Sequence, residues 1–351
     1  MGILSLGAFA QDLSRESKME EILASLANKE NNNPFGVLEF LHWNHPWNNY
    51  KYPDRRSLEK VSALMQEAGV GWVRTDFLWE DIEPSKGVFK FTKYDTIVDV
   101  VDRHNIKILG VLHYSTGWAS SCGKWNCPPQ DTRLFINYVK KVISRYKDKV
   151  KYWEIWNEPD SSTYWNPQDG LKSYCAFLKE VYLAAKKIDP DCKILNGGLA
   201  GGLSSVNKLY DSGAKGYFDI LNLHSFENPL HAAALNRVVA YAKLAHKIMA
   251  ANGDGGKKIW FSEIGCPGVK SVDKVANWWL GKNPDEAQQA GWVKKVYTQL
   301  LKNKDVQKVF WAFFRDCSGH WESGVDYFGL LRWDYSRKPS FIAYQECSRK
   351  K

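Results

Sequence analysis

The sequence predicts an α/β fold, a single (β/α)8 barrel of the TIM type. Short apolar, β-rich runs alternate with segments of helical period, eight such units fill the chain, and no linker marks a second domain. Continuous apolar strands that alternate with amphipathic helices indicate parallel strands covered by helices. Barrels of this kind commonly reach this length as one unit. A doubly wound sheet is less favoured, because no glycine-rich phosphate turn follows the first strand.

The first half of the chain supplies four of these units. Strands are expected at residues 36–41, 70–77, 106–114 and 150–158, with helices at 57–69, 94–105, 131–146 and 171–188. In the first helix, one apolar face is formed by Leu58, Val61, Met65 and Ala68. Gly69 is the C-cap residue that ends this helix, and Asp131 is an N-cap candidate for the third.

The second half continues the same alternation. Strands are expected at residues 192–198, 218–226, 257–265 and 306–316. Helices are expected at 236–253, 285–303 and 339–350, and a poorly defined helical stretch lies around 206–217. In the helix at 285–303, Trp292, Val296 and Leu300 share a face, which is typical of a helix packed on a sheet.

Composition narrows the classes of function. The chain has 351 residues, 44% hydrophobic and 25% charged, which is typical of a globular protein, and no run is long enough to cross a bilayer. The net charge of +9 is spread over many helical faces, whereas nucleic-acid binding would be better supported by a clustered basic stripe. The sixteen tryptophans favour a groove that stacks flat ligands over a purely structural use.

The N-terminus and the cysteines indicate an oxidising compartment. Residues 1–10 end in an A-x-A-like pattern at Ala8–Ala10, so we expect the remnant of an export signal, a barrel over residues 11–351, and a secreted or periplasmic protein. Cys122 and Cys127 are expected to form a local disulfide. The alternative, half of a zinc site, lacks a second CxxC or a matching pair of histidines. Cys175 and Cys192 are expected to be buried thiols.

Polar side chains stand where the expected strands end, which is where the reacting groups of such a barrel lie. These positions carry Glu39, His42, Arg74, Asp76, His113, Asn157, Glu158, Asn196, His224, Glu263, Trp311 and Arg315. Singly, each has a structural explanation: Arg74 could pair with Asp76 or Glu158, and a lone histidine could be a satisfied core residue. Together they indicate an active site, because a structural barrel does not need ionisable groups at nearly every strand end.

Two of these groups suit acid and base chemistry on a sugar. Glu158 ends the fourth strand and Glu263 the seventh, so the two carboxylates can face each other across the barrel mouth. Carboxyl groups about 5–5.5 Å apart suit double displacement at a sugar carbon, whereas about 6.5–9.5 Å would leave room for a water and invert the product. A cation such as Arg74 would keep the nucleophile ionised, and the tryptophan-rich flanks of Glu158 make it the better acid.

The motifs around these residues resemble a known group of enzymes. "WEIWNEPD" (153–160) and "IWFSEIG" (259–265) look like the paired signatures of the retaining glycoside hydrolases of clan A. The resemblance spans most of the chain through "WVRTDFLWEDIEPSKGVFKFTKYD", "GVLHYSTGWAS" and "DYFGLLRWDYSRKPSFIAYQ". Within this clan, the sequence is most similar to family 39 and its endoglycosidase relatives, and family 5 is next.

By this resemblance, Glu158 is the general acid/base and Glu263 the nucleophile of a β-glycosidase. Asn157 would bind the sugar 2-hydroxyl, a contact that strengthens in the transition state, and Arg74 would lie beneath Glu263. The implied substrate is a polysaccharide or oligosaccharide. We expect no cofactor, no metal, no nucleic-acid or membrane partner, and a monomer.

The resemblance also assigns residues around the reacting sugar. His113 and His224 would line the subsite where cleavage occurs, and Trp311 would form its apolar floor, although an ordinary strand aromatic is a competing interpretation. Many relatives carry a tyrosine where this chain has Phe226, so Tyr114 would supply the hydrogen bond to the nucleophile, or the nucleophile would go without it.

Length and loops favour endo action. Family 39 β-xylosidases usually add a β-sandwich for which this chain has no room, which favours an open-groove endoglycosidase. The loops after the third and eighth strands could shape subsites with Trp125, Trp321 and Tyr327, by stacking sugars or by packing alone.

Three other functions stay open. The first is a carbohydrate-binding barrel that has lost catalysis, and the second is a transglycosylase that uses the same two glutamates. The third is a metal-dependent hydrolase built from His42, His45, His113 and His224, which lacks a full ligand set in the sequence.

Overall fold

A closed barrel of eight parallel strands forms the centre of the computed structural model, which describes residues 33–42, 45–46, 48–167, 169–271, 276, 278–321 and 323–350. The strands run in chain order, and β8 pairs with β1 to close the ring. They are β1 (Phe35–Leu38), β2 (Trp72–Leu78), β3 (Lys107–His113), β4 (Tyr152–Ile155), β5 (Lys193–Asn196), β6 (Ile220–Ser225), β7 (Lys258–Ile264) and β8 (Val306–Ala312). The predicted (β/α)8 barrel is confirmed.

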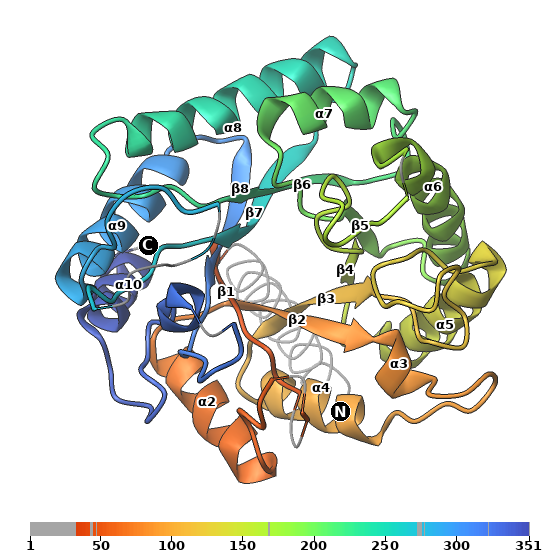
Figure 1. The fold of residues 1–351 in the computed structure, drawn as a ribbon, viewed down its shortest axis with the longest axis horizontal. Helices are drawn as coiled ribbons and strands as arrows, with labels where there is room; N and C mark the ends of the chain where they lie inside the picture. The colour runs from red at the N-terminus through yellow and green to blue at the C-terminus, as the bar shows by residue number, and fades with distance from the viewer. Residues whose placement is uncertain are drawn as a thin grey trace, which may run out of the picture.

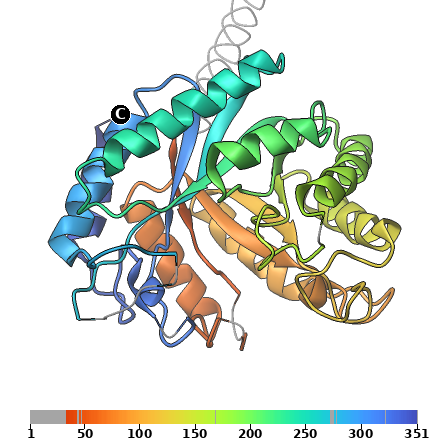
Figure 2. The ribbon, with the colours of Figure 1, turned by 45° about the horizontal axis from the view of Figure 1, so that its top comes forward.

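Helices surround the strands on the outside of the barrel, as Figures 1 and 2 show. The helices are α2 (Arg55–Glu67), α3 (Trp79–Ile82), α4 (Thr92–Arg103), α5 (Thr132–Tyr146), α6 (Leu171–Ile188), α7 (Gly202–Asp211), α8 (Ala234–Ala251), α9 (Glu286–Leu300), α10 (Pro339–Arg349) and the 3-10 helix η1 (Gly324–Tyr327). The predicted Asp131 cap is confirmed, because its carboxylate accepts a hydrogen bond from the Arg133 backbone N–H. The helix around 206–217 was placed too late, since α7 covers Gly202–Asp211 and a left-handed residue, Gly213, follows it.

Tryptophan builds much of the core rather than a groove. Seven tryptophans are among the largest fully buried side chains: Trp72, Trp79, Trp153, Trp156, Trp165, Trp260 and Trp311. Burying a large apolar side chain stabilises the fold by roughly 2–3 kcal/mol. The excess of tryptophan therefore reflects core packing as much as a binding site. The number of tryptophans alone could not distinguish these two uses.

One aromatic layer fills the interior of the barrel. Trp72 contacts Trp260 edge to face at 5.2 Å, and Tyr152 stacks on Trp260 at 5.1 Å, with Leu109 and Phe310 in the same buried cluster. These side chains come from different strands, as in the layered interiors of such barrels. The barrel is therefore packed rather than open, and a ligand site has to lie at its mouth.

The cysteine predictions agree with the structure. Cys122 and Cys127 form a disulfide within the loop after β3, and Cys175 and Cys192 are buried free thiols. The expected export signal over residues 1–10 lies outside the described residues. Within the described part of the chain, no helix combines the length and the apolar character needed to cross a bilayer.

Candidate active site

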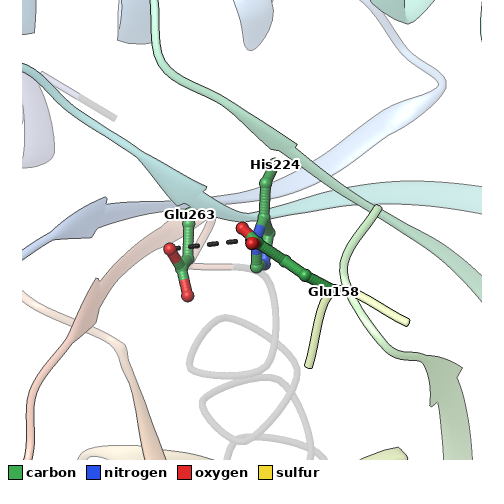
Figure 3. A group of neighbouring side chains, drawn as sticks. All are labelled: Glu158, His224 and Glu263. Carbon is green, nitrogen blue, oxygen red and sulfur yellow. Dashed lines mark hydrogen bonds and ion pairs between the residues drawn. The ribbon is translucent and has the colours of Figure 1, made fainter. Parts of the chain in front are cut away.

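Glu158 and Glu263 reach the barrel mouth from opposite sides. Glu158 lies just beyond β4, where its backbone adopts a φ of +42° and its N–H donates to the Gly198 carbonyl at 3.1 Å. Glu263 lies near the end of β7. In Figure 3 the Glu158 side chain reaches toward Glu263, and the ring of His224, from β6, lies beside the Glu158 carboxylate. The side chain of each glutamate is 14% exposed, so both are sheltered yet reachable from solvent.

The separation of these carboxylates is short. One carboxylate oxygen of Glu158, one of Glu263 and one ring nitrogen of His224 all lie within 4.8 Å of one another. His224 Nδ1 is 2.8 Å from Glu158 Oε1 and 3.8 Å from Glu263 Oε2. This spacing is in the range of the double-displacement geometry and leaves little room for the extra water that an inverting mechanism needs.

Arg74 organises the floor of the site. Its Nε and Nη2 donate to Glu154 at 2.7 and 2.9 Å, and its Nη1 donates to Glu263 Oε1 at 2.7 Å. Arg74 Nη2 also donates to Asn157 Oδ1 at 2.8 Å. Because the amide oxygen of Asn157 is occupied in this way, its NH2 group is the part left to donate to a ligand. Arg74 therefore pairs with Glu154 and Glu263, not with Asp76 or Glu158.

Glu154 is a functional residue that the sequence reasoning missed. Its side chain is fully buried and holds the guanidinium of Arg74 in a bidentate pair. The missed signal was its context, since a single carboxylate inside the apolar run "KYWEIW" requires a buried cation as partner. Glu154 thereby aims the remaining Arg74 nitrogen at Glu263.

Burial and the neighbouring charges together set the pKa values of Glu263 and His224. Burial raises the pKa of Glu263 above its ordinary value, although the positive charges of His224 and Arg74 act in the opposite direction. Burial lowers the pKa of His224, but the Glu263 and Glu158 carboxylates outweigh it and raise that pKa overall. The protonation states of Glu263 and His224 therefore depend on each other.

His113 and Tyr114 lie beside the site rather than in the cleft. His113 Nε2 is 3.1 Å from Asp76 Oδ1, and the Tyr114 ring stacks on the His113 ring at 3.8 Å. Tyr114 also contacts Trp156 and Trp125 edge to face. In the described part of the chain it makes no hydrogen bond to Glu263. Tyr114 therefore does not supply the hydrogen bond expected at Glu263, and the described donor to this carboxylate is Arg74.

The predicted apolar floor residue does not reach the cleft. Trp311 is fully buried, and its indole N–H donates to the Phe328 carbonyl at 2.8 Å. Phe313, two residues further along the chain, lines the cleft instead and stacks on Trp321 at 4.9 Å with 14° between the rings. β8 ends at Ala312, so Trp311 lies within the strand and Phe313 lies in the turn that follows it. Sequence alone did not place the end of this strand.

A cleft of about 1140 Å³ surrounds the two glutamates. Beside Glu263 it is lined by aromatic and apolar side chains from the β7 and β8 loops, namely Trp278, Phe313, Trp321, Val325 and Phe328. Beside Glu158 it is lined by residues of the β4 loop, α7 and α8, among them Ser161, Thr163, Tyr164, Leu203 and Tyr241. Phe226 and Trp278 contact each other at 5.3 Å in this cleft, and Trp278 was not foreseen from the sequence.

Several polar strand-end residues serve the fold instead. Lys51 Nζ lies 2.6 Å from Glu39 Oε1 with both side chains fully buried, and the Arg315 backbone N–H donates to Glu39 Oε2 at 2.8 Å. His45 pairs with Asp81 at 2.8 Å. Of the four histidines of the metal-hydrolase alternative, His42 and His113 both contact Asp76, whereas His45 contacts Asp81 and His224 contacts Glu158.

Among the described residues, the acid and histidine group with converging donor atoms is Glu158, His224 and Glu263. There the Arg74 guanidinium, 2.7 Å from Glu263, places a positive charge beside the group.

Comparison with known proteins agrees with this geometry. Residues 63–197 match the sequence profile of glycosyl hydrolase family 10, which belongs to the same clan that the motifs resemble. An endo-1,4-beta-xylanase of Claviceps purpurea is 32% identical over 156 residues, which cover 40% of this chain and 45% of that protein. Endo-1,4-beta-xylanase B of Thermotoga neapolitana is 23% identical over 78% of each chain. The chain spans less than half of the length of the curated relatives that it matches at 29–32% identity.

A solved structure extends the likeness over the whole barrel. A family 39 glycoside hydrolase from Bacteroides cellulosilyticus superposes with a TM-score of 0.69 at 22% identity, over 91% of this chain and 64% of that one. This likeness concerns the fold. The chain is therefore a (β/α)8 barrel related to the clan A glycoside hydrolases, with structural similarity to family 39 enzymes.

Proposed function

We propose that this protein is a retaining β-glycosidase that cleaves a polysaccharide internally, with Glu263 as nucleophile and Glu158 as general acid/base. The observation that carries the proposal is the carboxylate pair, with oxygens within 4.8 Å of each other in a cleft of about 1140 Å³. Because several relatives are endo-1,4-beta-xylanases, a β-1,4-linked polymer is the substrate class to test first.

The proposed reaction has two steps. In the first, Glu263 attacks the anomeric carbon while Glu158 protonates the departing oxygen, so that a glycosyl ester forms and the glycosidic bond breaks. In the second, Glu158 takes a proton from water, which attacks the same carbon and releases Glu263. Arg74 favours the ionised form of Glu263 that attacks, against the effect of burial, and the NH2 group of Asn157 donates to the sugar 2-hydroxyl.

The two sides of the cleft suit the two parts of the substrate. The retained sugar bonds to Glu263, so it lies toward the aromatic side formed by the β7 and β8 loops. The leaving group takes the proton of Glu158, so it departs toward Tyr164, Leu203 and Tyr241. Aromatic faces stack on the apolar faces of sugar rings, which supports a polymer lying along this groove.

The disulfide in the β3 loop supports secretion or a periplasmic location, because such bonds persist in oxidising compartments. We propose that the enzyme acts there as a monomer.

Hydrolysis of a panel of plant, fungal and bacterial polysaccharides tests the function, with the Glu263→Ala protein as control. We expect oligosaccharides of several lengths from one polymer, absent in the control, because internal cleavage yields fragments rather than single sugars. Products that are only monosaccharides would contradict endo action. No product from any polymer, with binding retained, would favour the catalytically inactive barrel, and longer products formed with an added acceptor would favour the transglycosylase.

Trp321→Ala is expected to raise KM for the polymer about tenfold with kcat nearly unchanged, since loss of one stacked ring costs about 1.4 kcal/mol of binding. Steady-state kinetics on the polymer measure it. Trp125→Ala is the matched control, because Trp125 is 46% exposed but lies outside the cleft lining. Equal effects of both variants would contradict a stacking role for Trp321.

A further inference from the structure

Ser262 is a buried hydroxyl directly before the proposed nucleophile. Its side chain has no exposed surface, and its Oγ lies 2.9 Å from His224 Nε2. The other ring nitrogen of His224, Nδ1, faces Glu158 Oε1 at 2.8 Å and Glu263 Oε2 at 3.8 Å. His224 is therefore held between two carboxylates on one side and one hydroxyl on the other.

The two sides of the ring differ in what they can accept. Two carboxylates face Nδ1, so a proton on Nδ1 is favoured whenever these groups are ionised. Ser262 faces Nε2 with a group that both donates and accepts. It can donate to the bare nitrogen of a neutral imidazole, or accept from the N–H of an imidazolium. An ionised carboxylate at this position could only accept and would favour the imidazolium.

Packing makes Ser262 the partner of Nε2 in this structure. The His224 side chain is fully buried, and a Cβ built on Gly198 would fall 2.0 Å from Nε2. The ring edge therefore lies directly against the backbone at Gly198. Ser262 is itself fixed, because its backbone N–H donates to Asn222 Oδ1 at 3.3 Å.

We propose that Ser262 is a positioning residue whose hydroxyl accepts the Nε2–H of His224 and so holds Nδ1 toward the two carboxylates. His224 carries the positive charge when Glu158 and Glu263 are both ionised. When Glu158 takes up a proton, the proton comes from Nδ1 across the 2.8 Å contact, and the neutral ring keeps its Nε2 proton on Ser262. This role rests on the proposed function, since it serves the glutamate pair. The other charged groups around His224 are Arg74 and, beyond it, Glu154.

Ser262→Ala tests this role through the titration of His224. The lost hydrogen bond is stronger to the charged imidazolium than to the neutral ring, so the variant should lower the pKa of His224 by about one unit. With less positive charge beside it, Glu263 should become harder to ionise. The acidic limb of the kcat/KM profile should then move upward by a similar amount.

Two measurements on the full chain separate the possible outcomes. NMR of ¹⁵N-histidine-labelled protein follows the titration and the tautomer of His224 without any turnover. The His224 signals are assigned as those that disappear in the His224→Gln variant. The pH profile of kcat/KM follows the acidic limb. Ser262→Thr, which keeps the hydroxyl, should behave like the wild type. Ser62→Ala is the matched control, because it removes a buried hydroxyl on α2 that has no partner among the described residues.

An unchanged pKa of His224 in Ser262→Ala would overturn the inference. Equal pKa shifts in Ser262→Ala and Ser262→Thr would overturn it too, because they would show that packing, and not the hydroxyl, causes the effect. A shift in Ser262→Ala alone supports it, whether or not a substrate has been found. Absence of turnover in the wild type would count against the proposed function and would leave the titration result standing.

Discussion

Glu263→Ala is expected to abolish hydrolysis of aryl β-glycosides, with a loss on the order of 10⁶-fold in kcat. The reason is that Glu263 is the carboxylate that converges with Glu158 on His224, and without it Arg74 would point its free nitrogen at an empty space. The measurement is initial-rate kinetics with a nitrophenyl glycoside, whose good leaving group needs no protonation. Glu180→Ala, an exposed residue on α6, is the matched control and should keep the wild-type rate.

Azide should restore turnover of the Glu263→Ala variant. A small anion can occupy the space of the missing carboxylate and attack the anomeric carbon from the same side, so that a carbon–nitrogen bond forms as the bond to the leaving group breaks. The product should be a glycosyl azide of inverted anomeric configuration, which NMR identifies. Retained configuration, or wild-type rates without azide, would remove Glu263 from the role of nucleophile.

Glu158→Ala is expected to affect substrates differently according to their leaving groups. Substrates with poor leaving groups, such as the natural polymer, should lose about 10²–10⁴-fold in the first step, because they need a proton from a positioned acid. Substrates with good leaving groups should form the glycosyl ester readily and then stall, since the base for the second step is missing.

A burst of nitrophenol followed by slow turnover, measured by stopped-flow absorbance, would show this behaviour. The polymer and the aryl glycoside serve as each other's control within the same protein. An equal loss for both substrates, without a burst, would argue that Glu158 positions the substrate rather than transferring a proton. Azide should accelerate the second step here and give a product of retained configuration, the opposite of the result with Glu263→Ala.

The sequence by itself determined the architecture and the two glutamates that are proposed as catalytic. Eight apolar strands alternating with helices of period 3.6 left a closed barrel as the arrangement that buries them all. In a parallel barrel the strand ends meet at one mouth, so Glu158 and Glu263 had to lie near each other wherever the helices began. The short spacing of Cys122 and Cys127 in the sequence likewise predicted the local disulfide.

Tertiary structure alone decided which neighbours act with them. The place where a strand ends decides whether an aromatic residue packs in the core or lines the cleft: Trp311 is buried within β8, and Phe313 lines the cleft from the turn after it. The choice of Arg74 between several acids depends on distances across the barrel, and only the fold brings Glu154 and Glu263 within 2.7 Å of its nitrogens. The contact of Ser262 with His224 joins adjacent strands whose pairing shifts by one residue between Leu223 and His224. The alternation of strands and helices in the sequence determines which residues reach the mouth of the barrel. The packing of the folded chain determines what each of them contacts there.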